Sequence, residues 1–228
     1  MKVSVLNLSA QIAAMFVVFA LLLFLPAGTV HWAAGWIFLA LFFAGTIAIS
    51  VWLFEVNPAL LNERLTGMGK ADQKAWDKAL MLLISLVFLA WLIVMPLDAV
   101  RFQWSHVPVW VQAVGGVLFV IGWYVIFLAY RENTYLSPAV RIQLDREQTV
   151  ISTGPYRFVR HPMYAGVIPF IFGTSLLLGS WYGVLGGFIL ILLIARRAVL
   201  EERTLREELP GYAAYMAQVK YRMIPHLW

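Results

Sequence analysis

Six stretches of apolar residues, separated by shorter polar segments, dominate the pattern of this chain. They lie at about residues 10–25, 33–54, 80–97, 109–130, 163–179 and 182–199. Each stretch is close to the ~20 residues that an α-helix needs to cross a bilayer. The last two are joined by a short turn at Gly179 and Ser180. The pattern predicts an all-α fold, a polytopic transmembrane helical bundle with six hydrophobic segments, the last two forming a tight helical hairpin.

The composition is that of an integral membrane protein. Of the 228 residues, 62% are hydrophobic and 13% are charged, whereas about a quarter are charged in soluble domains. The first apolar run is followed closely by further runs of spanning length, so we interpret it as a retained span and not as a cleaved signal peptide. The absence of cysteine excludes disulfides, thiolate metal sites and a cysteine nucleophile. We expect one integral membrane domain over residues 1–228, with four spans in 1–130.

Basic residues are distributed unevenly between the two sides of the predicted bundle. With a cytoplasmic amino terminus, 16 of the 17 Lys and Arg residues lie on the cytoplasmic side, and Arg101 lies outside. The positive-inside rule therefore predicts a multi-pass protein with both termini in the cytoplasm. This topology also accounts for the net charge of +5, and we expect no nucleic-acid partner.

Two polar segments connect the predicted spans on the cytoplasmic side. Residues 62–78 mix charges with Trp76, which fits either a short helix on the membrane surface or a solvated connector. Residues 131–160 form the longest polar segment, and loops of this length are commonly functional or disordered. Interspersed apolar residues favour order, and Thr149-Val150-Ile151 has the character of a short β-strand. We expect this loop, the hairpin and the tail to form one site within 131–228.

The hairpin brings distant polar residues together. A helix rises about 1.5 Å per residue, so two antiparallel helices of this length return the chain to the depth from which it left. Arg197, Glu201 and Glu202 therefore come back to the level of His161 and Tyr164. Taken singly, these residues are also explained as ordinary charged span ends or as an i,i+4 pair. Their convergence favours a ligand site, because polar residues at membrane depth usually face a cavity or the bundle interior.

The same residues carry a resemblance to a known family. The run Gly154-Pro-Tyr-Arg-Phe-Val-Arg-His-Pro-Met-Tyr-Ala-Gly166 precedes the hairpin, and Glu201-Glu202-Arg-Thr-Leu and Gly211-Tyr-Ala-Ala-Tyr215 follow it. This arrangement resembles the carboxy-terminal half of isoprenylcysteine carboxyl methyltransferases, and the same core resembles membrane phospholipid N-methyltransferases. The resemblance covers about residues 131–228.

The resemblance implies S-adenosylmethionine as the methyl donor, held between the loop and the hairpin. It implies that Arg197 contacts the substrate carboxylate and that Asn133 lies near the acceptor entrance, and these two are the expected catalytic residues. The implied cofactor-binding residues come from the loop, the start of the hairpin and its end. They are Gln143, Gln148, Thr149, Val150, Ile151, Tyr156, His161, Pro162, Met163, Tyr164, Glu201 and Glu202.

These residue types suit such a cofactor. Aromatic faces attract a sulfonium, a glutamate can meet an amino or ribose group, and arginine binds a carboxylate with paired donors. We expect a lipophilic small-molecule or lipid-modified acceptor from the membrane lipids, with carboxyl O-methylation of an isoprenylcysteine-like substrate as the first hypothesis. That reaction needs no general base, because a carboxylate is already ionised near neutral pH. No metal is expected to take part.

Three alternatives stay open from the sequence. A phospholipid or small-molecule N- or S-methyltransferase would share the cofactor site and would also require removal of a proton, for which His161 and the tyrosines are available. An NADPH-dependent membrane reductase would need a basic set for the extra phosphate, and no dedicated set is apparent in the sequence. A scaffold or transporter component would not need Tyr164 or Glu201, and no pattern of inverted repeats supports transport.

Overall fold

The computed structural model describes residues 4–66, 69 and 71–228, and the secondary structure of these residues is helical. The α-helices are α1 (Val5–Ala27), α2 (Ala33–Val56), α3 (Pro58–Thr66), α4 (Ala75–Pro96), α5 (Val109–Glu132), α6 (Pro162–Leu177), α7 (Trp181–Glu208) and α8 (Tyr212–Gln218). A π-helical turn, η1 (Leu97–Arg101), extends α4, and two short 3-10 turns, η2 (Leu144–Arg146) and η3 (Gly154–Arg157), lie in the long loop.

The predicted polytopic helical bundle is confirmed. Each of the six apolar stretches lies in a helix, and five of these helices are long and apolar enough to cross a membrane: α1, α2, α4 with η1, α5 and α7. The sixth, α6, has 16 residues and is shorter than a typical span. Helix α7 continues to Glu208, beyond the predicted end at residue 199. It therefore carries the charged residues of the predicted site on regular helix.

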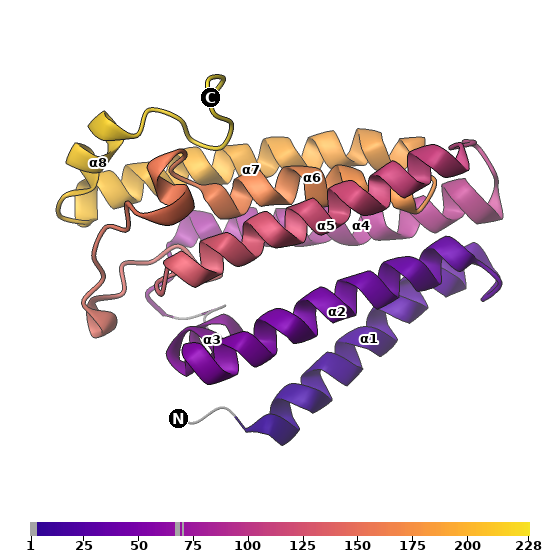
Figure 1. The fold of residues 1–228 in the computed structure, drawn as a ribbon, viewed down its shortest axis with the longest axis horizontal. Coiled ribbons are helices and arrows are strands. Elements are labelled where there is room, and N and C mark those ends of the chain that lie inside the picture. Colours follow the sequence, from indigo (N-terminus) through magenta and orange to yellow (C-terminus); the bar gives the residue numbers. More distant parts are fainter. Residues whose placement is uncertain (1–3, 67–68, 70) are drawn as a thin grey trace.

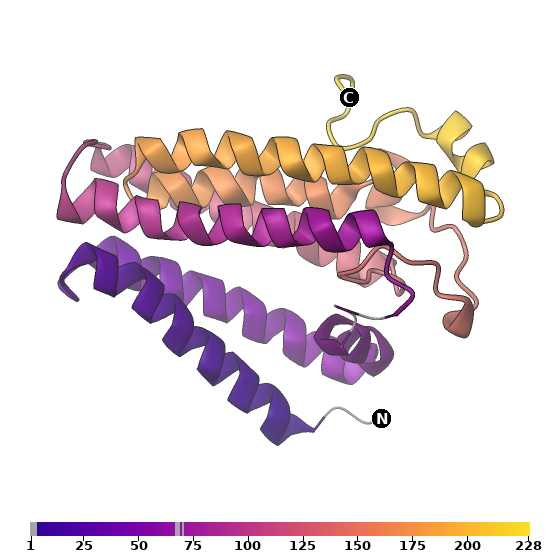
Figure 2. The ribbon, with the colours of Figure 1, turned by 180° about the vertical axis from the view of Figure 1, so that it is seen from behind.

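The helices run roughly along one axis, and the chain reverses at each end (Figure 1). Helices α4, α5, α6 and α7 form the main bundle, in which α6 lies between α5 and α7 and α4 packs on α7. The α1–α2 hairpin lies on one side of this bundle, as both views show (Figures 1 and 2). Helix α3, the long loop and α8 gather at one end of the molecule. That end holds the carboxyl end of α5, the start of α6 and the end of α7.

Helices α5 and α6 approach each other closely because glycines line their contact. A Cβ atom added to Gly122 of α5 would lie 2.6 Å from the backbone nitrogen of Phe170 in α6. A Cβ atom added to Gly166 of α6 would lie 3.0 Å from the carbonyl oxygen of Gly122. Small residues of this kind let membrane helices pack backbone to backbone. The contact fixes the end of α5 against the start of α6, where the predicted site begins.

The turn between α6 and α7 is stabilised by a buried polar cluster at the other end of the bundle. Gly179 takes a left-handed conformation with φ of 81°. The Ser180 hydroxyl accepts a hydrogen bond from the Gly183 nitrogen at 2.8 Å and donates one to the Asp98 carboxylate at 2.5 Å. Asp98 also accepts from Ser105, so its buried charge is met by hydroxyl donors. This turn directs α7 back toward the site.

Two predictions about the connectors are revised. Thr149-Val150-Ile151 is irregular and forms no strand, because no other described segment offers its backbone a pairing edge. The segment 62–78 is not a single helix, since α3 ends at Thr66, and Trp76 already belongs to α4, which begins at Ala75. A position of α3 on the membrane surface stays a prediction. Residues 67, 68 and 70 of this connector lie outside the described residues.

Candidate active site

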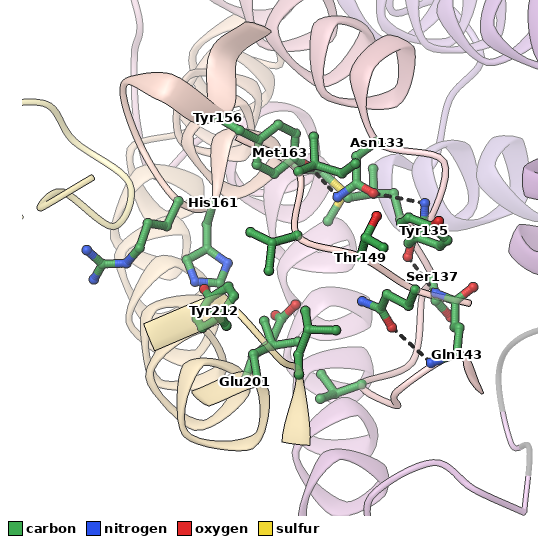
Figure 3. A pocket seen from close by; sticks show the side chains of 18 of the residues that line it. Asn133, Tyr135, Ser137, Gln143, Thr149, Tyr156, His161, Met163, Glu201 and Tyr212 are labelled. Carbon is green, nitrogen blue, oxygen red and sulfur yellow. Dashed lines mark hydrogen bonds between the residues drawn. The ribbon is translucent and has the colours of Figure 1, made fainter. Parts of the chain in front are cut away.

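A pocket of roughly 810 Å³, part of it open to solvent, lies at the end of the bundle where the loop meets α6, α7 and α8. Figure 3 shows His161 and Tyr212 on one wall, Gln143 and Ser137 on the opposite wall, and Glu201 between them. The lining comes from segments far apart in the sequence. It consists of Asn133, Tyr135, Leu136, Ser137, Ala139, Val140, Arg141, Gln143, Gln148, Thr149, Val150, Ile151, Tyr156, Arg160, His161, Met163, Tyr164, Glu201, Leu205, Leu209, Tyr212 and Tyr215.

Eleven of the fourteen residues proposed from the sequence line this pocket: Asn133, Gln143, Gln148, Thr149, Val150, Ile151, Tyr156, His161, Met163, Tyr164 and Glu201. The other three lie just behind the lining. Pro162 is the first residue of α6 and is buried. Arg197 lies behind Tyr164, and Glu202 lies behind His161, each within a buried ion pair. The structure thus places the predicted catalytic Arg197 outside the pocket surface.

Tyr164 joins a chain of charged groups that crosses from α4 to the pocket. Its hydroxyl accepts a hydrogen bond from Arg197 Nη1 and donates one to Glu201 Oε2, each at 2.7 Å. Arg197 in turn donates from Nε to Asp77 Oδ1 at 2.8 Å and from Nη2 to the Pro138 carbonyl at 2.8 Å. Arg197 and Asp77 are both buried. The guanidinium is therefore neutralised inside the protein, while Glu201 faces the pocket.

A second buried cluster supports the wall that carries His161. Glu202 accepts hydrogen bonds from Arg160 Nε at 2.6 Å and from Arg222 Nε at 2.7 Å. The backbone nitrogens of Arg160 and His161 donate to the carbonyls of Tyr221 and Arg222, so the tail runs beside the start of α6. The His161 Nε2 atom lies 3.3 Å from Glu202 but makes no well-aligned hydrogen bond. Glu202 thus holds the wall together and is not available to a ligand.

Comparison with known protein families bears directly on this region. Residues 110–210 match the phospholipid methyltransferase family model. The match begins in α5 and ends after α7, so it contains the loop, the α6–α7 hairpin and most of the pocket lining. No curated protein gives a significant sequence match to the chain. The match supports the prediction of an S-adenosylmethionine-dependent membrane methyltransferase, in the broad family that joins the isoprenylcysteine and phospholipid enzymes.

Part of the pocket wall is held by residues outside the phospholipid methyltransferase match. Arg141 of the loop forms two hydrogen bonds to Glu63 of α3, at 3.1 and 3.0 Å. Burial alone would lower the pKa of Arg141, but hydrogen bonds to Glu63, Asp145 and Asp72 raise it above its ordinary value, so this cation stays charged. The Val140 nitrogen donates to Asp77 at 2.9 Å. The first part of the chain therefore fixes the loop beside the pocket.

Sequence reasoning missed several lining residues, above all Tyr212 and Tyr215 of α8. Both were quoted within the motif that follows the hairpin, but no role was assigned to them. Their spacing of three was the available signal, because it places both rings on one side of a helix. The Tyr215 hydroxyl donates to the Tyr156 carbonyl at 2.6 Å, while the buried Tyr212 hydroxyl has no partner among the described residues. Burial raises the pKa of Tyr156, Tyr212 and Tyr215, so all three remain protonated near neutral pH.

The donor set of the pocket fits S-adenosylmethionine. Glu201 forms no salt bridge with any described residue and can meet a cationic group. The Tyr212 hydroxyl is a buried polar atom with no hydrogen-bond partner among the described residues, and His161 Nε2 lies 3.3 Å from Glu202 without a well-aligned bond. Tyr156 and the stacked rings of His161 and Tyr164, 5.4 Å apart, supply aromatic faces for a sulfonium or adenine. A zwitterionic, partly aromatic ligand would satisfy each of these groups.

Proposed function

We propose that this protein transfers a methyl group from S-adenosylmethionine to a lipophilic acceptor that reaches the pocket from the membrane, on the cytoplasmic side. The observation that carries the proposal is the Glu201 carboxylate, which lies among buried tyrosines at the end of a membrane-spanning bundle. This carboxylate accepts a hydrogen bond from Tyr164 and forms no salt bridge with a described residue. The phospholipid methyltransferase match over residues 110–210 supports the same reaction class.

The residues of the pocket would bind and orient the reactants. When bound, the cofactor supplies an electrophilic methyl group and its sulfur retains the electron pair of the broken bond. Glu201 and the aromatic faces of Tyr156 and Tyr164 would hold the cationic donor. The apolar residues Leu205 and Leu209 would exclude water from the reacting atoms. Alignment of the two reactants in this enclosed space accounts for most of the expected rate enhancement.

The charges around the pocket favour a neutral amine or thiol acceptor over a carboxylate. Three arginines at or behind the lining are each paired with at least one carboxylate: Arg141, Arg160 and Arg197. Arg146 lies behind Gln143 and donates to its side-chain oxygen at 2.7 Å and to Thr134 at 3.0 Å. A carboxylate acceptor would have to displace one of these internal partners, which is costly for buried pairs. An amine loses a proton on methylation, and the imidazole of His161, whose Nε2 lies 3.3 Å from Glu202, is the group in the lining proposed to take part in its removal.

Carboxyl methylation of an isoprenylcysteine-like acceptor is the second candidate. It is supported by the sequence motifs and by the 2.7 Å contact between Arg197 and Tyr164, because a small movement of Tyr164 would expose the guanidinium to the pocket. Asn133 would then lie on the acceptor side, with its amide nitrogen donating to the Tyr156 hydroxyl at 3.0 Å.

The cofactor proposal is tested by calorimetric titration of the purified protein with S-adenosylhomocysteine. We expect saturable binding with one site per chain. Absence of heat from folded protein in detergent and in lipid nanodiscs would refute the methyltransferase proposal. Titration with NADPH in parallel tests the reductase alternative, for which no heat is expected.

The acceptor is tested by radiolabel transfer from S-adenosylmethionine into defined lipids. Nanodiscs containing phosphatidylethanolamine are compared with matched phosphatidylcholine nanodiscs, which lack a free amine, and with a prenylated cysteine analogue bearing a free carboxylate. We expect label in the amine lipid. Base-labile label in the prenylcysteine analogue alone would select the carboxyl candidate, because methyl esters hydrolyse and methylated amines do not.

The long loop is proposed to close partly over the bound cofactor. Residues near Val140 are tied to α4, but Leu144 at the loop tip is 82% exposed. We therefore expect the movable part to be the stretch that begins at Leu144. Bound S-adenosylhomocysteine should slow tryptic cleavage after Arg146, and an unchanged cleavage rate at saturating ligand would contradict closure.

A further inference from the structure

Asp77 is a fully buried carboxylate whose position is not explained by the match to known methyltransferases. It lies in the first turn of α4, with a relative exposure of 0%, and it precedes the matched residues 110–210. Its oxygens accept hydrogen bonds from Arg197 Nε at 2.8 Å, from Gln73 Nε2 at 2.9 Å and from the Val140 nitrogen at 2.9 Å. Burial of a carboxylate costs free energy unless its hydrogen-bond and ion-pair partners compensate the lost hydration. The ion-pair partner of Asp77 is Arg197, which also donates to Tyr164 in the pocket lining.

The arrangement of charges around Tyr164 explains why such a partner is needed. Arg197 and Glu201 contact the same phenol oxygen, each at 2.7 Å. The two opposite charges are therefore separated by no more than about twice that distance. At such a separation in a buried site, a guanidinium and a carboxylate attract each other strongly. Without a competing anion, Arg197 would pair with Glu201 and neutralise it.

We propose that Asp77 is a positioning residue that keeps Glu201 available to the cofactor by holding Arg197 in a separate ion pair. This inference rests on the proposed function, because it assumes that Glu201 meets the cationic part of S-adenosylmethionine. Asp77 acts through Arg197 and does not touch the pocket, since it is absent from the lining. The electrostatic state of the site is thus set by a residue of α4.

Asp77 also supports the pocket wall, and this second role must be separated from the first. Its bond to the Val140 nitrogen and the bond from Arg197 Nη2 to the Pro138 carbonyl hold the loop beside the pocket. Loss of one partner of a buried ion pair by itself makes Asp77→Asn more harmful than removal of both charges, so the two roles are separated by their dependence on Glu201. The charge-holding role predicts that Glu201→Gln, added to Asp77→Asn, weakens ligand binding little further, because Arg197 already neutralises Glu201 in that variant. A purely structural role predicts that the two losses add.

The test compares Asp77→Asn with the double variant Asp77→Asn and Arg197→Gln. Calorimetry with S-adenosylhomocysteine and with S-adenosylmethionine is performed on the full chain in nanodiscs. We expect Asp77→Asn to weaken binding by at least about tenfold, the equivalent of one charged hydrogen bond. We expect the double variant to bind within about threefold of the unaltered protein. A folded double variant that binds as weakly as Asp77→Asn would overturn the proposal.

The double variant keeps the test decisive even when the single variant does not fold. Asp77→Asn leaves an unpaired buried cation, whereas the double variant removes both charges and is therefore the better tolerated change. Retained binding by the double variant is required by the proposal. Weak binding by the folded double variant refutes the proposal whether or not the single variant is obtained.

Asp98→Asn is the matched control. Asp98 is also 0% exposed and hydrogen-bonded, but it lies at the other end of the bundle beside Ser180. We expect this variant to lower thermal stability and to leave ligand affinity unchanged. If the unaltered protein binds neither ligand, the proposed function itself fails. If the unaltered protein binds and Asp77→Asn binds equally well, the inference about Asp77 fails while the proposed function stands.

Discussion

Replacement of Glu201 by glutamine removes one negative charge from the pocket and little else. The side chain keeps its shape, and its amide oxygen can still accept the hydrogen bond that Tyr164 donates at 2.7 Å. Glu201 is half-buried and forms no salt bridge with a described residue. We therefore expect Glu201→Gln to change the free energy of unfolding by less than about 1 kcal/mol.

The loss in ligand affinity should be much larger than this change in stability. Two unit charges about 5 Å apart interact by about 3 kcal/mol at an effective dielectric constant near 20. Partial exposure of Glu201 to solvent reduces this value, so we expect a loss of about 1.5–3 kcal/mol, or roughly 10- to 150-fold in the dissociation constant. The loss should be greater for S-adenosylmethionine than for S-adenosylhomocysteine if the carboxylate faces the sulfonium, and equal if it faces the amino group.

The assay is calorimetric titration of both ligands into Glu201→Gln and into Glu207→Gln. Glu207 lies on the same helix, is exposed and is absent from the pocket lining, so its replacement changes the net charge equally. We expect Glu207→Gln to bind both ligands normally. If Glu201→Gln binds both ligands as tightly as the unaltered protein, the assignment of Glu201 to the cofactor is wrong.

The remaining predictions concern stability and topology. Burial raises the pKa of Tyr212, so its stabilising contribution is complete below pH 10 and is lost as the pH rises from there through the folded-state pKa. Tyr212→Phe should therefore flatten the fall in melting temperature at alkaline pH. An equally steep fall would contradict this. Gly122→Ala should lower the free energy of unfolding by about 1–3 kcal/mol through overpacking, measured by thermal unfolding. Gly116→Ala is the control, because the nearest new contact of its added Cβ atom would be 3.7 Å away, and it should be neutral or stabilising. Single cysteines placed at Leu144 and Gln103 should react with a membrane-impermeant maleimide from the cytoplasmic and the outer side, respectively, and the opposite labelling would reverse the predicted orientation.

The helices and the level of the pocket were predictable from patterns in the sequence, whereas the loop residues of the pocket were expected only from the family resemblance. Runs of apolar residues fix the spans, and the antiparallel return of α7 fixes the level at which Glu201 meets His161 and Tyr164. The error at Thr149–Ile151 has a physical cause, since β-branched residues favour extended backbone but a strand also requires a neighbour to pair with.

The partners of Arg197 were not predictable in the same way. Asp77 and Arg197 are 120 positions apart, and Glu63 and Arg141 are 78 apart. Asp77 lies in a first turn of α4, where an acidic residue is expected for its interaction with the helix dipole. Nothing local distinguishes it from a solvated helix start, and its complete burial results from the packing of α4 on α7.

The ion pairs in the fold therefore change the kind of ligand that is expected at the site. The family resemblance of the sequence implies that Arg197 contacts a substrate carboxylate. In the fold, Arg141 is paired with Glu63, Arg160 with Glu202, and Arg197 with Asp77, and all three arginines are buried. Glu201 is the acidic lining residue left without such a pair among the described residues. A pocket whose acidic side chain forms no direct salt bridge within the protein attracts a cation, which is the property a sulfonium donor requires before any acceptor enters.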